Sequence, residues 1–249
     1  MCTLSWLYSQ TGIEVFFNRD ESKNRPRAIP PAEYTSPNGH QYLMPLDTQS
    51  NGSWIGVTES GFCLCILNYY QGETPTGELI SRGLLVKTLL EISAEDAIYD
   101  YLDERDWKQY APFTLVLFFP NTKEPTALCW DGIYRDGDGH ALKPVAIHSP
   151  YTSSGVDFPA VSQARQTAYK ESFNLLENDN ISSNSTKLKS FHASHIPEKS
   201  KYSVCMHRSD ASTVSFSRIE ITSDLIEFEY AGGAPCQVSE FNMTSLPKK

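Results

Sequence analysis

Short apolar segments of strand length, arranged in pairs, constrain the fold of this chain more than any other feature. Residues 2–9 and 12–18 form one pair around a glycine turn, and residues 52–58 and 62–70 form another around "ESG". Such pairs are typical of β-hairpins. An antiparallel hairpin at the amino end would return its second strand to the first residues of the chain.

The predicted helices come in separate blocks. Leucine and valine recur at helical spacing over residues 74–93, and a second helix is predicted over Ser93–Tyr101, with Ser93 and Asp96 resembling a capping box. A third helix is predicted over residues 160–176. Because the helices do not follow each strand in turn, the order argues against a doubly wound parallel sheet. It favours an α+β fold of mostly antiparallel sheets covered by helices.

The rest of the chain divides into strands and polar connections. Proline and polar residues predict a surface loop over residues 21–41, and residues 177–190 read as a mobile loop. Residues 135–140 are expected to form a glycine-rich turn. Further strands are predicted at residues 113–119, 126–132, 201–207, 212–221 and 226–232. No linker divides the chain, so one domain over residues 1–249 is expected.

Charge and hydropathy exclude several classes of function. The net charge is 21 minus 30, or −9, and an acidic surface repels phosphate backbones, so nucleic acid is not an expected partner. The apolar run at residues 113–119 is far shorter than the roughly 20 residues of a membrane-spanning helix. The amino end lacks the pattern of a secretory signal, so a cytoplasmic protein without a membrane span is expected.

The six cysteines do not form a familiar metal-binding pattern. They lack a C-x-x-C pair, and no two histidines have the H-E-x-x-H spacing, so neither a metal site nor a disulfide framework is expected. Cys63 and Cys65 read as small buried apolar residues of a strand. We expect the cysteines to be mostly reduced.

Cys2 is the candidate nucleophile. A free cysteine has a pKa of about 8.5 and needs a base or a positive neighbour for activation. If Met1 is removed, the new α-amino group, with a pKa of about 7.7–8, lies on the same residue and can take the thiol proton. The alternative is that position 2 is small only for processing or burial.

Three later residues strengthen the first interpretation. The hairpin would return Arg19 and Asp20 close to Cys2, where arginine could favour the thiolate or a substrate carboxylate and aspartate could hold the α-amine. Asn68 ends an apolar run, and its amide is a suitable oxyanion donor. The alternatives are a polar strand end for Arg19 and Asp20, and an amide bonded to backbone for Asn68.

Several short motifs resemble a known family in the right order. "MCT" and "GFCLCILNYY" resemble the cholylglycine hydrolase and penicillin V acylase group of amino-terminal nucleophile hydrolases. A closer resemblance is to the NRDE family, whose eukaryotic members are called Transport and Golgi organisation 2. It rests on "NRDE" (18–21), "GSWIGVT" (52–58), "LNYY" (67–70) and "SRGLLV" (81–86).

The resemblance implies a fold and an activity. The fold is an αββα four-layer sandwich, in which two mostly antiparallel sheets lie face to face with helices outside. The activity is hydrolysis of a non-peptide C–N bond in a small acylated substrate, with Cys2 as nucleophile, Arg19 and Asp20 beside it, and Asn68 in the oxyanion hole. It requires no cofactor. The residues expected to contact substrate are Asn18, Tyr69, Thr152 and Arg165.

Two departures from the acylase pattern bear on these roles. Arg19 and Asp20 are adjacent, so they would face opposite ways on a regular strand. The acylases also have a second asparagine, which residues 147–155 lack, so Ser149 or Thr152 could substitute for it. The match at Arg165 is loose, and a solvent-facing helix arginine is its alternative.

A second class of function uses the same scaffold without catalysis. The eukaryotic relatives are associated with haem handling and lipid metabolism, which implies a carrier of haem or an acyl lipid. The chain lacks a C-x-x-C-H haem motif. The expected partner is a small-molecule acyl substrate under the first hypothesis and a bound cargo under the second. The sequence does not indicate an oligomeric state.

Overall fold

Two antiparallel sheets contain the thirteen strands of the computed structural model, which describes residues 1–133, 141–174 and 181–249. The six-stranded sheet has the order β10 (Tyr151–Ser153), β1 (Cys2–Tyr8), β2 (Ile13–Ser22), β11 (Ala211–Ile221), β12 (Leu225–Ala231), β13 (Asn242–Pro247). The seven-stranded sheet has the order β3 (Ile29–Thr35), β4 (Gln41–Leu46), β5 (Ile55–Thr58), β6 (Cys63–Asn68), β7 (Phe113–Phe118), β8 (Thr126–Trp130), β9 (Lys143–Pro144).

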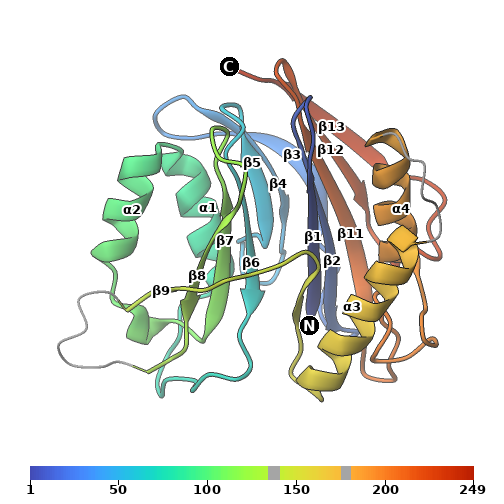
Figure 1. Ribbon diagram of the computed structural model, residues 1–249. Coiled ribbons are helices and arrows are strands. Elements are labelled where there is room, and N and C mark those ends of the chain that lie inside the picture. The colour runs from blue at the N-terminus through green and yellow to red at the C-terminus, as the bar shows by residue number, and fades with distance from the viewer. Residues whose placement is uncertain (134–140, 175–180) are drawn as a thin grey trace.

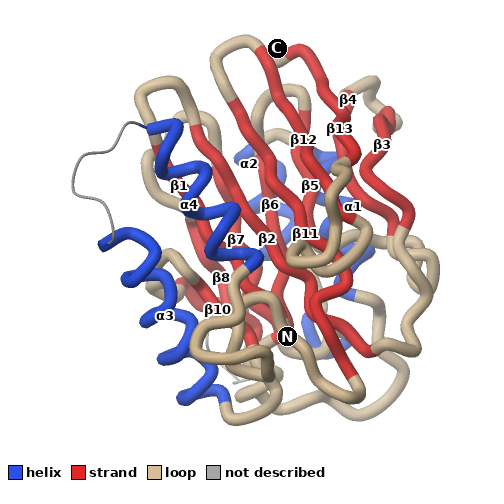
Figure 2. The backbone as a smooth tube through the Cα atoms, turned by 90° about the vertical axis from the view of Figure 1, so that its right-hand side faces the viewer, coloured by secondary structure: helices blue, strands red, loops and turns tan. Residues whose placement is uncertain are grey.

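Helices cover the outer face of each sheet (Figure 1). Helices α1 (Arg82–Ile92) and α2 (Glu95–Asp103) lie outside the seven-stranded sheet, followed by a short 3₁₀ turn at Trp107–Gln109. Helices α3 (Phe158–Asn174) and α4 (Ile181–Ala193) lie outside the six-stranded sheet, where α4 runs over β1 and β2 (Figure 2). The four layers confirm the predicted αββα sandwich.

Strand alternation sends neighbouring residues of the six-stranded sheet to different layers. In β1, Leu4 is fully buried in the core between the sheets, whereas Ser5 bonds His192 of α4 on the outer face. Under α3 and α4 lies a second apolar cluster, to which β2 contributes Phe16 and β11 contributes Phe216. Both faces of the sheet are therefore buried, and consecutive residues of one strand meet different surroundings.

The first hairpin has the register that the turn predicts. Gly12 has φ +152°, and a Cβ there would lie 1.8 Å from the backbone oxygen of Ile221, so the turn requires glycine. The hairpin places Cys2 opposite Arg19. On the other side of β2, the register of β11 shifts between Thr213 and Ser215, opposite Asp20 and Arg19 respectively. The predicted return of the chain to Cys2 is confirmed.

The expected surface loop over residues 21–41 is wrong in part. Residues Ile29–Thr35 form β3, and β2 itself extends to Ser22. Pro30 and Pro31 argued against a strand because proline cannot donate to a ladder. Strand β3 is an edge strand with a register irregularity between Ile29 and Ala32, where prolines are tolerated.

The helix boundaries also differ from the sequence pattern. Helix α1 begins only at Arg82, where the Ser81 hydroxyl accepts a hydrogen bond of 3.3 Å from the backbone N–H of Gly83. The predicted capping box at Ser93 is wrong. Ser93 ends α1 with φ +65°, and α2 begins after Ala94 without a side-chain cap.

Two connections after β10 differ from expectation. Within the segment expected to be a mobile loop, residues 181–190 belong to α4, and residues 177–180 lie outside the described part of the chain. The strand predicted at residues 201–207 is wrong, because this segment is irregular apart from a single bridge between His207 and Ser212. The predicted turn at residues 135–140 also lies outside the described residues. The short or polar strands β4, β9, β10 and β13 were not predicted.

None of the helices in the described part of the chain combines the length and the apolar character that crossing a membrane requires.

Candidate active site

Cys2 begins the strand at the centre of the candidate site. In the six-stranded sheet it lies between Arg19 of β2 and Ser153 of β10, its register partners on either side. The thiol is free and Cys2 is partly exposed. Burial raises the pKa of the thiol above its usual value, and the nearby amino terminus and Arg19 only partly oppose this effect. The thiol is therefore protonated at neutral pH and needs a base.

A small cavity of about 120 Å³, which we call the Cys2 cavity, opens beside this residue. Its wall combines Cys2 and Arg19 with Asn68 at the end of β6 and with the beginning of α1. A larger cavity of about 420 Å³ is also lined by Arg19, and another of about 500 Å³ is also lined by Asp20. The described residues around the Cys2 cavity are Cys2, Arg19, Asp20, Glu21, Arg25, Asp47, Ser50, Ser53, Trp54, Ile66, Asn68, Ser81, Arg82 and Gly83.

Arg19 is held rigidly between a ring and a carboxylate. Its guanidinium carbon lies 4.0 Å from the centroid of the Trp54 ring, and the guanidinium forms a buried ion pair with Asp47. Asp47 also accepts from Arg25 Nε at 2.8 Å. Burial alone would raise the pKa of Asp47, but the bond and charge of Arg25 and the charge of Arg19 outweigh it and lower the pKa to about 2. This carboxylate therefore neutralises part of the positive charge near Cys2.

Asn68 connects the cavity wall to the chain start. Its side-chain N–H donates a 2.9 Å hydrogen bond to the Tyr70 hydroxyl, which also accepts from the Met1 amino group at 3.3 Å. Its backbone oxygen accepts from the hydroxyl of Ser153, the register partner of Cys2. Cys2, Arg19 and Asn68 are thus brought together at one cavity. The oxyanion role of Asn68 stays a prediction.

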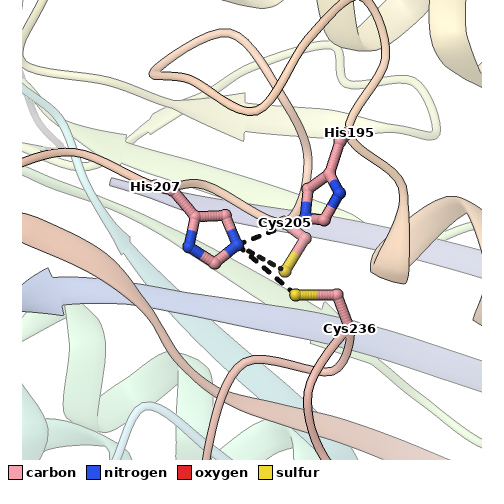
Figure 3. A group of neighbouring side chains, drawn as sticks. All are labelled: His195, Cys205, His207 and Cys236. Carbon is pink, nitrogen blue, oxygen red and sulfur yellow. Dashed lines mark hydrogen bonds between the residues drawn. The ribbon is translucent and has the colours of Figure 1, made fainter.

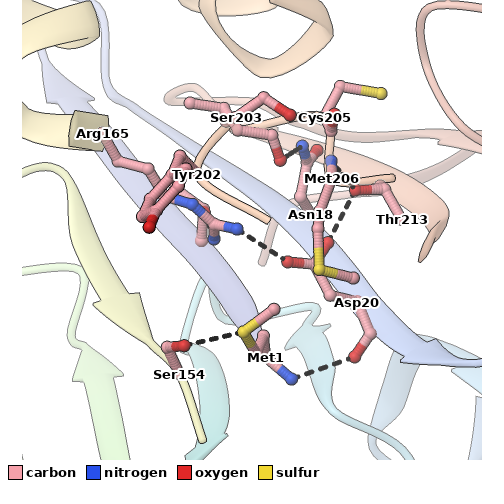
Figure 4. Close-up of polar contacts among 12 residues, drawn as sticks. Met1, Asn18, Asp20, Ser154, Arg165, Tyr202, Ser203, Cys205, Met206 and Thr213 are labelled. Carbon is pink, nitrogen blue, oxygen red and sulfur yellow. Dashed lines mark hydrogen bonds and ion pairs between the residues drawn. The ribbon is translucent and has the colours of Figure 1, made fainter. Parts of the chain in front are cut away.

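Asp20 lies on the other face of the sheet, as alternation with Arg19 requires. Its buried carboxylate accepts from Arg165 Nη2 at 3.2 Å and from the Thr213 hydroxyl at 2.6 Å (Figure 4). The Met1 amino group instead donates to the backbone oxygen of Asp20 at 3.2 Å. Burial raises the pKa of Asp20, against the lowering effect of Arg165. The predicted anchoring of the amine by this carboxylate is therefore not formed while Met1 is present.

Three of the residues expected to contact substrate lie on that same helix-covered face. Arg165 is fully buried and donates to the Thr3 hydroxyl at 2.5 Å, and Thr152 is the register partner of Thr3. Asn18 is buried and donates to the backbone oxygens of His192 at 2.8 Å and of Val204 at 3.0 Å. The structure does not bring these side chains to the Cys2 cavity, and the solvent-facing alternative for Arg165 is wrong.

The fourth expected substrate contact, Tyr69, is half-buried. Its backbone N–H donates to the oxygen of Pro112 at 3.1 Å, and it is not among the described residues that line the Cys2 cavity. Ser149, the other candidate for the missing asparagine, accepts from the backbone N–H of Trp6 at 3.3 Å and donates to the Tyr169 hydroxyl at 3.4 Å. The roles proposed for Tyr69 and Ser149 stay predictions.

Comparisons with known proteins agree with the fold and with the order of motifs. The family model described as Transport and Golgi organisation 2 matches residues 1–132, more than half of the chain. The chain belongs to this family. No curated protein matches it significantly.

Two solved structures show the fold of this family member. One is the N-acylethanolamine-hydrolyzing acid amidase ortholog of Caenorhabditis elegans, 12% identical, with a TM-score of 0.53 over 88% of this chain and 92% of that chain. The other is an arginine-to-leucine variant of conjugated bile acid hydrolase from Clostridium perfringens, 13% identical, with a TM-score of 0.53 over 98% of this chain and 92% of that chain. These likenesses show that the chain shares the fold of these two structures.

Sequence reasoning missed Arg82 as a site residue, although the family motif "SRGLLV" contains it. Arg82 lines the Cys2 cavity and donates to the Pro112 oxygen at 2.7 Å, and burial lowers its pKa. The turn before β5 packs against this end of α1, because the Ser53 N–H donates to the Gly83 oxygen at 2.9 Å. A Cβ on Gly52 would lie 2.2 Å from the carbonyl carbon of Gly83, so this approach requires glycine.

Proposed function

We propose that this protein is an amino-terminal nucleophile hydrolase that cleaves the C–N bond of a small acylated amide through a thioester on Cys2. The proposal depends on one observation: the Cys2 thiol adjoins a cavity whose wall also contains Arg19, Asn68 and Arg82. A nucleophile, an amide donor and fixed positive charge are the groups that acyl transfer requires.

The reaction needs removal of Met1. The freed α-amine of Cys2 takes the thiol proton, and Sγ attacks the carbonyl carbon to form a tetrahedral oxyanion. Collapse breaks the C–N bond, and the leaving nitrogen takes the proton from the α-ammonium group. Water then attacks the thioester, giving a carboxylic acid and the regenerated thiol. The raised pKa of the thiol makes this internal base necessary.

The neighbouring groups have distinct proposed roles. The Asn68 amide donates to the oxyanion, after exchanging its present bond to the Tyr70 hydroxyl. Arg19, already paired with Asp47, fixes the cavity wall and favours the thiolate. Arg82 lacks a carboxylate partner among the described ion pairs, so it is the better candidate for binding a substrate carboxylate.

Removal of Met1 would also enlarge the site. The Met1 side chain lines the 500 Å³ cavity, where its sulfur accepts from the Ser154 hydroxyl at 2.7 Å. That cavity shares Asp20 and Glu21 with the Cys2 cavity. Ligand sites usually measure about 300–1,000 Å³, so the larger cavity is the proposed seat of the acyl or leaving group.

Intact mass and turnover together test the proposal. We expect the purified protein to lack Met1 and to hydrolyse at least one member of a panel of acyl amides. Cys2→Ala and Cys2→Ser should lower kcat/KM by more than about 1,000-fold, whereas the control Cys129→Ala should retain it. A mass increase equal to the acyl group, dependent on Cys2, should appear after rapid quenching.

Full turnover by Cys2→Ala would exclude the mechanism. The carrier alternative predicts a different pattern: retained Met1, no turnover of any amide, and saturable binding of haem or an acyl lipid that is unaffected by Cys2→Ala.

A further inference from the structure

Four side chains from two connections of the chain meet near the candidate active site, where His207 lines the 420 Å³ cavity together with Arg19. His195 follows α4, Cys205 and His207 lie in the connection from α4 to β11, and Cys236 lies between β12 and β13 (Figure 3). One ligand atom from each residue lies within 4.8 Å of the other three. All are described residues, and both cysteines are free thiols.

Three of the six separations between the ligand atoms agree with ligation of a single metal ion, and the other three are within 4.8 Å. His207 Nε2 lies 3.2 Å from His195 Nε2, 3.6 Å from Cys205 Sγ and 3.4 Å from Cys236 Sγ. In a tetrahedron with Zn–N of about 2.05 Å and Zn–S of about 2.3 Å, neighbouring nitrogens lie about 3.3 Å apart and a nitrogen and a sulfur about 3.6 Å apart. The three separations match these values within about 0.2 Å.

Hydrogen bonding alone does not account for the cluster. An imidazole nitrogen carries either one proton or one lone pair, so it makes one good hydrogen bond. Three polar atoms nevertheless converge on His207 Nε2. A cation at their centre would give each of the four atoms a bond and would draw both thiols into the thiolate form.

We propose that His195, Cys205, His207 and Cys236 form a structural zinc site. Two thiolates and two neutral imidazoles neutralise Zn²⁺, and four protein ligands leave no open position for a catalytic water. Binding therefore releases two protons, one from each thiol, and involves no redox step.

The site would hold together parts of the fold that support the candidate active site. Met206 lies between two of the ligands, and its backbone N–H donates to the Thr213 hydroxyl at 2.8 Å. That hydroxyl donates in turn to the Asp20 carboxylate. Cys205 is buried and the other three ligands are partly exposed, so a chelator can reach the metal from one side.

The test begins with metal analysis of protein purified without a metal-binding tag. We expect about one zinc per chain, and about two protons released per zinc when the reduced apoprotein is titrated with Zn²⁺ at pH 7. Co²⁺ should give the intense visible bands of a tetrahedral thiolate complex. Chelation should lower the melting temperature, and addition of zinc should restore it.

Matched variants localise the site. Cys236→Ser and His195→Ala should each lose most of the bound zinc and the cobalt bands. The controls Cys2→Ser and His148→Ala, which replace a cysteine and a histidine outside the cluster, should keep both. Because the cobalt spectrum is recorded on the wild-type chain, the test stands even if a variant fails to fold.

Two results would overturn the proposal. One is that the reduced wild-type protein binds neither zinc nor cobalt, as expected if Cys205 and Cys236 serve only as a disulfide. The other is stoichiometric binding that both cluster variants retain. Loss of zinc from the cluster variants would support the site whether or not the protein hydrolyses an amide, so the two proposals fail independently.

Discussion

Replacing Arg165 by methionine tests how the helix-covered face supports the candidate site. Arg165 is fully buried, and its guanidinium bonds both Asp20 and Thr3. Methionine retains most of the apolar side chain but removes the charge, which leaves the Asp20 carboxylate buried without its cation.

The expected loss of stability is large. Removing one partner of a buried ion pair costs about 3–5 kcal/mol, because the remaining charge is uncompensated. In a chain of this size, each kcal/mol shifts the melting temperature by about 2–4 °C, so Arg165→Met should melt about 6–20 °C lower. Lys170→Met, at an exposed position later in α3, should change the melting temperature little.

The loss should depend on pH in a defined direction. Burial already raises the pKa of Asp20, and Arg165 opposes that rise. Without Arg165 the folded protein should hold the Asp20 proton to a higher pH than the wild type does. The difference in unfolding free energy between wild type and Arg165→Met therefore grows as pH rises above the pKa of Asp20 in folded wild type. It shrinks as pH falls below that pKa, because Asp20 is then protonated in both folded proteins.

The coupling energy between Arg165 and Asp20 can be measured by urea unfolding at several values between pH 5 and 8. The proteins compared are wild type, Arg165→Met, Asp20→Asn and the double variant. The double variant should recover much of the loss, because a neutral amide replaces the stranded carboxylate. A loss below about 1 kcal/mol at pH 7, or a loss that increases toward acidic pH, would refute this reasoning.

Two further predictions concern the Cys2 cavity. The pKa of Asp47 is lowered to about 2, so its ionised carboxylate contributes stability that is present above the unfolded pKa near 4 and is lost as pH falls through about 2. Asp47→Asn should therefore cost about 1–2 kcal/mol at pH 7 and make stability less dependent on acidic pH. Unchanged urea midpoints would contradict this prediction. Arg82→Gln should lower kcat/KM about 10- to 150-fold for an acyl amide that carries a carboxylate, and much less for a neutral analogue, in steady-state assays. An equal loss of kcat/KM for both substrates would exclude recognition of the substrate carboxylate by Arg82.

The pattern of the sequence predicted the parts of the fold that depend on local contacts. Gly12 and the alternation around it fixed the first hairpin, and therefore the pairing of Cys2 with Arg19. The same alternation predicted that Asp20 faces away from Arg19. These inferences succeed because a hairpin register depends only on the turn and on the two strands that flank it.

Features that depend on distant partners were missed. Strand β3 carries two prolines, which a sheet tolerates only at its edge. Helix α4 is polar along much of its sequence, and its position depends on packing against the six-stranded sheet. The four-residue cluster escaped notice because Cys236 lies 29 positions after His207, without a recognisable spacing. Arg82 was visible in a motif, but its approach to Cys2 depends on the contact between Gly52 and Gly83.

The two chain ends lie at opposite ends of the sandwich, which matters for handling the protein (Figure 1). Lys249 bonds Glu59 through its backbone N–H and its ammonium group, each at 2.8 Å, whereas the Met1 amine lies between Asp20 and Tyr70. A purification handle or fluorophore attached after Lys249 would leave the Cys2 cavity accessible. The same addition before Met1 would place polypeptide beside Asp20 and Tyr70 and would prevent the exposure of the Cys2 amine on which the proposed function depends.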